Sequence, residues 1–358
     1  MEKYIHGIGI TAGSQMLKWD ILNQHIHPRK LQPGDHVNIF INFEAVLRNI
    51  SMQKNLHDIV NFHKHKMVIE LESAILNLMA NYRMYFKKEK CIPRVFLYST
   101  TIDFDNQHMS VYNKFYRSYY KNRYVQNPQF KLVGDVLNEI IIPEIKLILL
   151  YVPGCYFIET KTFDSSLVPL IISETDSSKN VIVTSDIFDT LYLFNSNFIT
   201  IYIKRRYSHF NVISDIDGAI QSIIKDESPL DLTIFNSELY YRLLLSIKGS
   251  KIRNIRSAKG FGYGKFLKLL KDGINKDIVL RNFESIDSVL ELFPDKYHQD
   301  IKLAFQCTSL ETQHGLLNEV DISEIQSQIV DKVDIPSLES LNNKRFLEFP
   351  INLQGLLD

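Results

Sequence analysis

The sequence predicts an α/β protein, with a mostly parallel β-sheet wrapped by helices and a helical region after it. Short β-branched runs alternate with longer segments of helical spacing as far as about residue 212. That alternation is typical of parallel strands joined by helical crossovers. After about Ile213 the strand signals stop and helical spacing dominates, so the rest of the chain is predicted to be mainly helical.

Five segments have the composition of buried strands. Each is a short run rich in Val, Ile, Phe or Tyr, as expected for strands that are covered on both faces. We expect the first four to lie in one mostly parallel sheet. The runs are Val37–Asn42, Arg94–Ser99, Cys155–Thr160, Val181–Ser185 and a fifth that begins at Ile199.

The segments between and after these runs carry apolar residues at helical spacing. They are Ile59–Phe86, Asp103–Val125, Leu137–Leu150, Asp164–Ser173, Ala219–Leu270 and Ile286–Phe293. We divide the chain accordingly into a leader, an α/β core, a helical region and a tail expected to pack on the core. These parts are 1–36, 37–212, 213–310 and 311–358.

Composition points to a globular protein inside a cell. Hydrophobic residues make up 45% of the 358 residues and charged residues 23%, which is ordinary for a globular chain. No run approaches the roughly 18 apolar residues of a membrane span, and the start lacks the basic head and apolar core of a signal peptide. Cys91, Cys155 and Cys307 are scattered, so we expect reduced thiols, no membrane association and a cytoplasmic location.

The charge balance excludes a general polycation, because 41 basic residues match 41 acidic ones. Binding to nucleic acid would therefore depend on local clusters. One cluster is Arg117–Arg123, and the other is Lys248–Lys271, which contains no acid. The alternative for such a run is a solvated face. The basic residues of the second cluster are Lys248, Lys251, Arg253, Arg256, Lys259, Lys265, Lys268 and Lys271.

Glycines within the second cluster suggest a phosphate site. Gly260, Gly262 and Gly264 directly precede the amphipathic segment KFLKLLK. Glycines at a helix start let another backbone approach, and the free N–H groups there favour an anion. A turn between helices that only packs is the alternative.

The first cluster alternates cations with aromatic rings. Arg117, Lys121 and Arg123 are interleaved with four tyrosines. Bases stack on rings while cations follow phosphates, so this pattern suits single-stranded nucleic acid. An amphipathic helix with its tyrosines packed inward is the alternative. The tyrosines are Tyr116, Tyr119, Tyr120 and Tyr124.

The glycine-rich segment KGSKIRNIRSAKGFGYGKFLKLLKDG resembles the helix–hairpin–helix core of the flap endonuclease (5′-nuclease) superfamily, GDKSDNIPGVKGIGPKTALKLLKEFG. The match is ungapped from Gly249 to Lys271 and keeps Asn254, Ile255, Gly260 and Gly262. In that family this element grips duplex DNA through backbone amides and often holds a potassium ion.

Four further segments resemble the family in its order. IFINFEAVLR is similar to the first strand, LLIDGNNLLYR, and FYRSYYKNRY to YPEYKANR on the helical arch. GCYFIETKTFDSSLVPLI is similar to GIPVIEVPGYEADDVIGTL, and VIVTSDIFDTLYLF to VTIVSGDKDLLQLV. The resemblance spans roughly Val37 to Gln306. It implies a PIN-like core with an arch around 103–125, a helix–hairpin–helix region within 213–310, and branched, flap or single-stranded DNA as partner.

The resemblance also implies where metal-binding acids would stand, since the family cuts DNA with divalent metals held by carboxylates. Asp164 and Asp189 match such acids, whereas Asp186 is one residue out of place and Glu44 lies two residues past its position. Seven matched positions hold no acid: Asn42, Ser99, Ser166, Leu167, Ile187, Ser250 and Arg253.

The change at Arg253 puts a guanidinium where a metal ligand belongs, and a cation repels a metal at short range. We expect Arg253 to pair with Asp164 or Asp189, with no metal cofactor bound. The alternative is that Glu44, Asp164, Asp186 and Asp189 hold one Mg²⁺ weakly. Asp164 could instead simply cap its helix.

Three hypotheses follow from the resemblance. The first is a DNA-binding protein of replication or repair that has lost nuclease activity. The second is an active, divergent, Mg²⁺-dependent 5′–3′ exonuclease or flap endonuclease. The third is a structural virus or phage component, in line with an Asn-, Ile- and Lys-rich composition typical of AT-rich genomes; such a protein would be associated with the virion.

Overall fold

The structure is a computed structural model of the chain. It describes residues 31–43, 64–100, 137–161, 163, 165–184, 187–194, 198–203, 210–213, 215–216, 218–220, 237–250, 255, 258, 260–262, 264–266, 268, 286–291, 293–308 and 321–330. No helix within these residues is long and apolar enough to cross a membrane.

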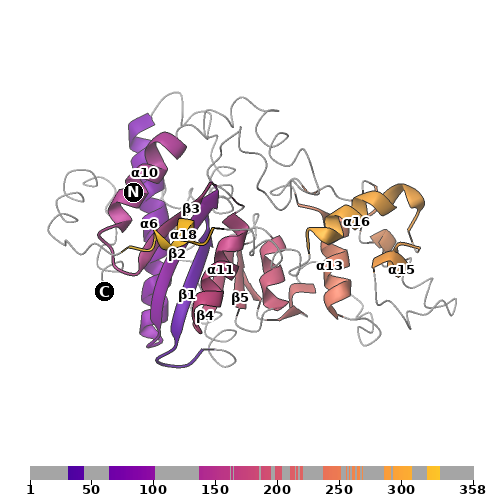
Figure 1. Cartoon of the computed structure of the whole chain (residues 1–358), viewed down its shortest axis with the longest axis horizontal. Coiled ribbons are helices and arrows are strands. Elements are labelled where there is room, and N and C mark those ends of the chain that lie inside the picture. The colour runs from indigo at the N-terminus through magenta and orange to yellow at the C-terminus, as the bar shows by residue number, and fades with distance from the viewer. Residues whose placement is uncertain are drawn as a thin grey trace.

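A six-stranded sheet forms the centre of the α/β part, in the order β3-β2-β1-β4-β5-β6 (Figure 1). The first five strands are parallel to their neighbours, and β6 runs antiparallel to β5. The predicted mostly parallel sheet is therefore confirmed. The strands are β1 His36–Asn42, β2 Ile92–Thr100, β3 Cys155–Thr160, β4 Lys179–Thr184, β5 Phe198–Ile203 and β6 Phe210–Ile213.

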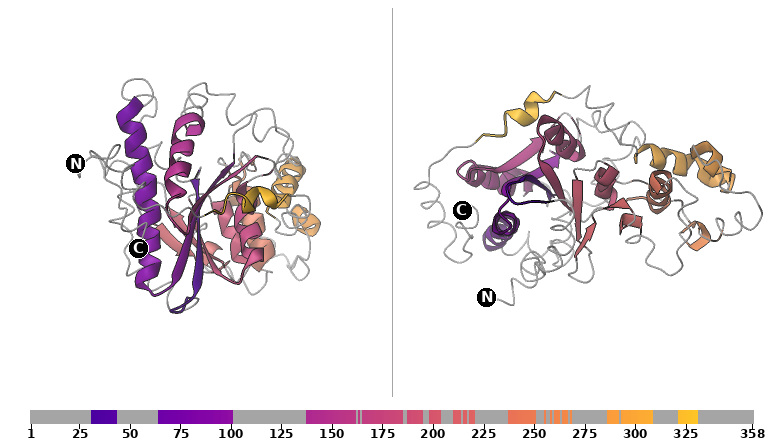
Figure 2. Two further views of the ribbon diagram at one scale, coloured as in Figure 1. Left: turned by 60° about the vertical axis from the view of Figure 1, so that its left-hand side comes forward. Right: turned by 90° about the horizontal axis from the view of Figure 1, so that it is seen from below.

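Helices cover both faces of the sheet (Figures 1 and 2). Side chains alternate between the two faces along β1, and both sets are apolar and need cover. Val37, Ile39 and Ile41 lie in one buried cluster, and Phe40 lies in the other. The first face is covered by α6 Lys64–Lys88, a π-helical turn η2 Leu137–Ile141 and α10 Ile142–Leu149. The second is covered by η3 Ser165–Leu167, α11 Val168–Thr175 and the 3-10 helix η4 Ile187–Phe194.

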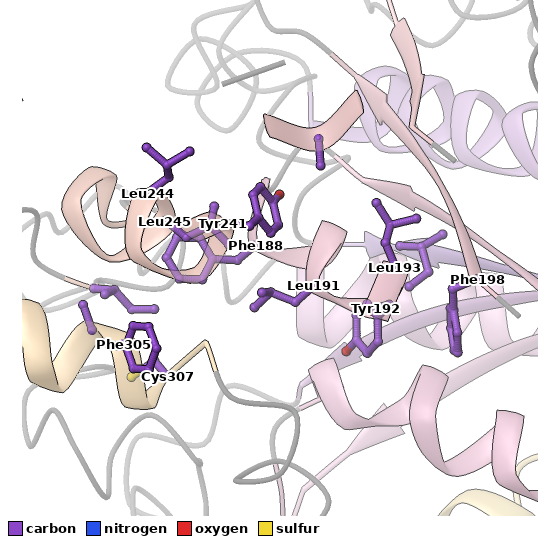
Figure 3. Packing of buried hydrophobic residues seen from close by; sticks show 14 of the residues in the cluster. Phe188, Leu191, Tyr192, Leu193, Phe198, Tyr241, Leu244, Leu245, Phe305 and Cys307 are labelled. Atoms are coloured by element: carbon purple, nitrogen blue, oxygen red, sulfur yellow. The ribbon is translucent and has the colours of Figure 1, made fainter. Parts of the chain in front are cut away.

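The buried cluster that contains Phe40, which we call the second core cluster, extends from the sheet into the helical part. Buried residues of α13 and α16 belong to the same cluster as the η4 side chains Phe188, Leu191 and Tyr192 (Figure 3). The Arg242 guanidinium of α13 lies 4.0 Å above the Phe305 ring of α16. These elements are α13 Ser237–Lys248, α15 Ile286–Leu290, η6 Asp295–Tyr297, α16 His298–Gln306 and α18 Ser323–Gln326.

The strand β6 was not indicated by the sequence, whereas α16 lies within the region 213–310 that is predicted to be helical but outside its individually predicted segments. β6 has only four residues, too few for a clear alternating pattern. Helices predicted over Ile59–Phe86 and Leu137–Leu150 are confirmed with shifted ends. The prediction for Asp103–Val125 lies outside the described residues, as do residues 1–30 of the leader and 311–320 and 331–358 of the tail.

Candidate functional site

The carboxyl ends of β1 and β4 lie side by side and supply the first polar groups of the site. Ile41 of β1 pairs with Val183 of β4, so Asn42 and Thr184 come next on adjacent parallel strands. Their side chains share one face, because side chains alternate along a strand. This is the face that carries η4 and α11.

Asp189 completes this group from the first turn of η4. Its side chain is fully buried. One carboxylate oxygen, Oδ2, accepts a hydrogen bond from Asn42 Nδ2 at 3.1 Å and another from Thr184 Oγ1 at 2.5 Å. An amide and a hydroxyl thus offset part of the cost of burying the charge. We call Asn42, Thr184 and Asp189 the carboxyl-end group.

The core holds Asp189 in place. On either side of it, Phe188 and Leu191 are buried in the second core cluster, and the Thr190 hydroxyl is hydrogen-bonded to the Tyr241 hydroxyl of α13. η4 is therefore fixed to both the sheet and the helical part, which gives the Asp189 carboxylate a defined position.

Ser99 lies at the same end of the sheet but on the other face. Asn42 pairs with Tyr98, and Ser99 pairs with Glu159; paired residues in parallel strands share a face. Glu159 forms an ion pair with Lys146 of α10. The Ser99 side chain therefore lies on the α6 and α10 face, away from Asn42.

The other positions matched to metal-binding acids are described in part. Ser166 and Leu167 are buried in η3, directly before α11. Ser250 is buried after α13, and Ile187 is the first residue of η4. Glu44, Asp164, Asp186 and Arg253 lie outside the described residues. Within the part of the chain that the structure describes, no three His, Cys, Asp or Glu side chains are grouped so as to hold a metal ion.

A second candidate region begins where α13 ends. Gly249 has a φ of +64°, a backbone conformation that favours glycine at a helix end. Ser250 and Ile255 then exchange two backbone hydrogen bonds, of 3.0 and 2.8 Å. The chain therefore folds back on itself directly after the helix.

A glycine turn follows this hairpin. Gly260 has a φ of +81°, and its carbonyl accepts a hydrogen bond from Lys265 Nζ at 2.7 Å. The Gly262 carbonyl accepts bonds from the N–H groups of Lys265 and Phe266, at 3.0 and 3.1 Å, and so begins a helical turn. The Phe266 ring stacks on Phe293 with centroids 5.6 Å apart, which fixes the turn to the helical core.

Gly262 and Gly264 face open space. A Cβ built at either position meets no atom of the described chain within 4 Å. Steric crowding by the described residues therefore does not explain why glycine stands at these two positions. Lys248, Lys265 and Lys268 are exposed around this turn. The remaining basic residues proposed to bind DNA lie outside the described residues: Lys251, Arg256, Lys259, Arg117, Lys121 and Arg123.

The sequence prediction missed a polar cluster at the opposite end of the sheet. Asn38 Nδ2 donates to Asn180 Oδ1 at 3.1 Å and to Asp176 Oδ1 at 3.3 Å. Arg94 donates to Asn38 Oδ1 through Nε and Nη2, at 3.1 and 2.9 Å, and pairs with Asp176. Asn38 in VNIFIN and Asn180 in KNVIVT could have signalled it, since a polar residue inside a buried strand needs partners.

Charge and hydrogen bonding stabilise the ionised form of Asp176 in this cluster. Burial alone would raise the pKa of its carboxyl group. Hydrogen bonds from Ser178 and the charge of the Arg94 guanidinium outweigh burial and hold that pKa below its ordinary value. We call Asn38, Arg94, Asp176 and Asn180 the amino-end cluster.

Comparison with known proteins gives a structural likeness. A crystal structure of the bacteriophage T5 flap endonuclease, a pseudo-enzyme in a product complex with DNA and metal ions, is similar over 82% of this chain and 95% of its own, with 12% identity and a TM-score of 0.49. No protein-family model matches the sequence. No curated protein sequence matches it either.

Proposed function

We propose that this chain is a DNA-binding protein of the flap endonuclease kind that recognises branched or single-stranded DNA and does not cut it. The observation that carries the proposal is the carboxyl-end group. Where the resembling family places metal-binding carboxylates, the buried Asp189 carboxylate is hydrogen-bonded by Asn42 and Thr184.

The donor set of this group does not suit a pair of divalent metals. Two-metal hydrolysis needs several anionic oxygens to hold the ions about 4 Å apart. Asn42 presents an N–H group toward Asp189, not an oxygen, and Thr184 donates its hydroxyl to the same oxygen atom. Each ion would have to displace these donors and find further acids to offset its dehydration.

Arg253 is proposed to supply the missing positive charge. A guanidinium near Asp164 or Asp189 would neutralise the carboxylate without a metal. A double-mutant cycle between Arg253→Gln and Asp189→Asn tests this pairing. A coupling energy of about 1 kcal/mol or more supports it, and additive effects contradict it.

DNA binding is proposed for the glycine turn and its lysines. The open space at Gly262 and Gly264 leaves room for a phosphate to approach the backbone N–H groups. Exposed Lys248, Lys265 and Lys268 would release counter-ions on binding. The turn would then act as a helix–hairpin–helix element, with a potassium ion as in the resembling family.

A second DNA contact is proposed for the arch segment around 103–125. Its cations, Arg117, Lys121 and Arg123, alternate with tyrosines, which suits the stacking of single-stranded bases. The two contacts together would favour DNA with a junction between duplex and single strand.

The binding test is a salt titration of a fluorescent 5′-flap DNA by anisotropy. Lys248→Glu with Lys268→Glu should weaken binding by at least about tenfold and lower the slope of log affinity against log salt by about two. Lys88→Glu with Lys90→Glu is the matched control, because these exposed lysines lie at the amino end of β2. A turn variant that binds as tightly as wild type would contradict the proposed DNA site.

A Mg²⁺-dependent nuclease is the alternative. It rests on Asp189 lying at the carboxyl end of β1 and β4, with Glu44, Asp164 and Asp186 as further ligands. Metal-dependent cleavage of the same flap DNA would establish it.

A further inference from the structure

A tyrosine from η6 lies against the glycine turn. Tyr297 is the last residue of η6, and a Cβ built at Gly260 would lie 3.7 Å from its hydroxyl oxygen. The Tyr297 ring packs on Phe261, the residue after Gly260, with ring centroids 5.3 Å apart. Phe261 is buried and also contacts the Phe293 ring at 5.1 Å. η6 therefore lies directly beside the turn, and we call Lys296 and Tyr297 the η6 wall.

The backbone around Tyr297 holds its hydroxyl in place. The Tyr297 N–H donates to the Pro294 carbonyl at 2.9 Å, and His298 Nε2 donates to the Phe293 carbonyl at 2.6 Å. The Tyr297 side chain is half-buried. Among the residues that the structure describes, none forms a hydrogen bond with its hydroxyl. A phenol can donate one hydrogen bond, so this donor is available to a ligand at the turn.

Two ammonium groups lie close to the same place. Lys265 Nζ donates to the Gly260 carbonyl at 2.7 Å, and Lys296 Nζ lies over the Tyr297 ring, 4.9 Å from its centroid. Both lysines are exposed. Lysine and tyrosine side chains are among those that contact phosphate oxygens of DNA. A phosphate at the turn would therefore meet donors from η6 as well as from the turn itself.

Acidic residues on the neighbouring elements keep the η6 wall from being a strongly basic surface. Two of them have basic partners, since Asp287 pairs with Lys302 at 2.8 Å and Asp295 lies 3.8 Å from His298 Nε2. The placement of hydrogen-bond donors, and not the net charge, is thus what favours a phosphate here. The described acids of this region are Asp287, Glu291, Asp295 and Asp300.

We infer that the η6 wall is a second contact to the DNA backbone at the glycine turn. The Tyr297 hydroxyl donates to a phosphate of the bound strand, and Lys296 offsets the charge of the backbone beside it. This inference rests on the proposed function, because it takes the turn to be a DNA site. A base could stack on the Tyr297 ring only by displacing Lys296 or Phe261. The contact is therefore to the backbone, which carries no sequence information directly.

Salt titrations by fluorescence anisotropy, with two 5′-flap DNAs of the same shape and different sequence, test the inference. Tyr297→Phe removes one oxygen atom and keeps the ring contact with Phe261. It should weaken binding by about fivefold to tenfold on both sequences. The slope of log affinity against log salt should not change, because the hydroxyl carries no charge. Lys296→Gln should lower that slope by about one.

Matched controls use the same substitutions elsewhere. Tyr151→Phe changes a half-buried tyrosine that follows α10, and α10 lies well away from α16 in Figure 1. Lys88→Gln changes an exposed lysine at the end of α6. Both should bind the two DNAs as wild type does. If Tyr297→Phe does not fold, the exposed Lys296→Gln still tests the η6 wall.

The outcomes separate this inference from the proposed function. Wild-type affinity in Tyr297→Phe, while Lys248→Glu with Lys268→Glu still weakens binding, would overturn the inference and leave the proposed function standing. A loss on one sequence alone would also overturn it, since the hydroxyl would then contact a base. If wild type binds neither DNA, the proposed function and the inference both fail.

Discussion

At the amino end of the sheet, Asn38 of β1 lies in a network that contains the ion pair of Arg94 and Asp176. At the carboxyl end, Asn42 of the same strand donates to the buried Asp189 carboxylate together with the Thr184 hydroxyl. The two asparagines are four residues apart along β1, so their side chains share a face of the sheet. One therefore joins a cluster that contains an ion pair, and the other lies beside a buried carboxylate that also accepts from a hydroxyl.

The largest expected effect is at the amino end. Asp176→Asn leaves the Arg94 guanidinium with a neutral amide in place of its counter-ion. The two side chains are 34% and 28% exposed, so we expect a loss of about 2 kcal/mol in the free energy of unfolding, below the about 3–5 kcal/mol of a fully buried pair. Urea unfolding at pH 7 measures it. Ser177→Ala, at an exposed position, is the control. If it lowers the free energy of unfolding as much as Asp176→Asn does, the amino-end cluster does not have the structural role that we assign to it.

A smaller effect is expected at the carboxyl end. Thr184→Val removes a hydroxyl that donates to a buried carboxylate, which should cost about 1–2 kcal/mol of unfolding free energy. Thr184→Ser keeps the hydroxyl and should recover about 1 kcal/mol of that loss. Thermal and urea unfolding of the Thr184→Val and Thr184→Ser variants measure the two losses. If serine and valine are equally destabilising, the hydroxyl does not support Asp189.

The smallest effect is a pH dependence confined to the amino end. The folded-state pKa of Asp176 lies below its ordinary value, so the charged carboxylate adds stability above an unfolded pKa of about 3.9. That contribution is lost as pH falls through the lower folded-state pKa. The stability difference between wild type and Asp176→Asn should therefore be smaller at pH 3 than at pH 7. A difference that grows on acidification would mean that Asp176 is not held in its charged form.

The sheet could be predicted from the sequence because its strands are buried runs of a recognisable length. VNIFIN, RVFLYS, CYFIET and NVIVTS all lie in the parallel part, within about two residues of the predicted ends. The family resemblance implies that Asn42, Ser99 and Asp189 cluster at the carboxyl ends of the strands. Asn42 and Asp189 do meet there, whereas Ser99 lies on the other face of the sheet.

Contacts between distant segments could not be predicted in the same way. The face occupied by Ser99 depends on the register of β2 against β1 and β3, which a shift of one residue reverses. The amino-end cluster joins three separate segments, and the bonds of Gln328 to Glu159 join residues 169 positions apart. A polar residue inside a buried run, such as Asn38 or Asn180, signals that a partner is needed, but no local pattern says which distant residue that partner is.

The measurement that tests the account most directly follows binding and cleavage of one 5′-flap DNA in the same samples, with Mg²⁺ or Mn²⁺ present. Under our proposal the purified chain should shift the DNA and leave it uncut. By the family resemblance, Asn42, Ser99, Ser166, Leu167, Ile187, Ser250 and Arg253 stand where a two-metal site would need acids. Arg253→Asp alone should not restore cleavage, since the other positions remain changed. Metal-dependent cleavage that disappears in Asp164→Ala or Asp189→Ala would contradict the account and establish an active nuclease.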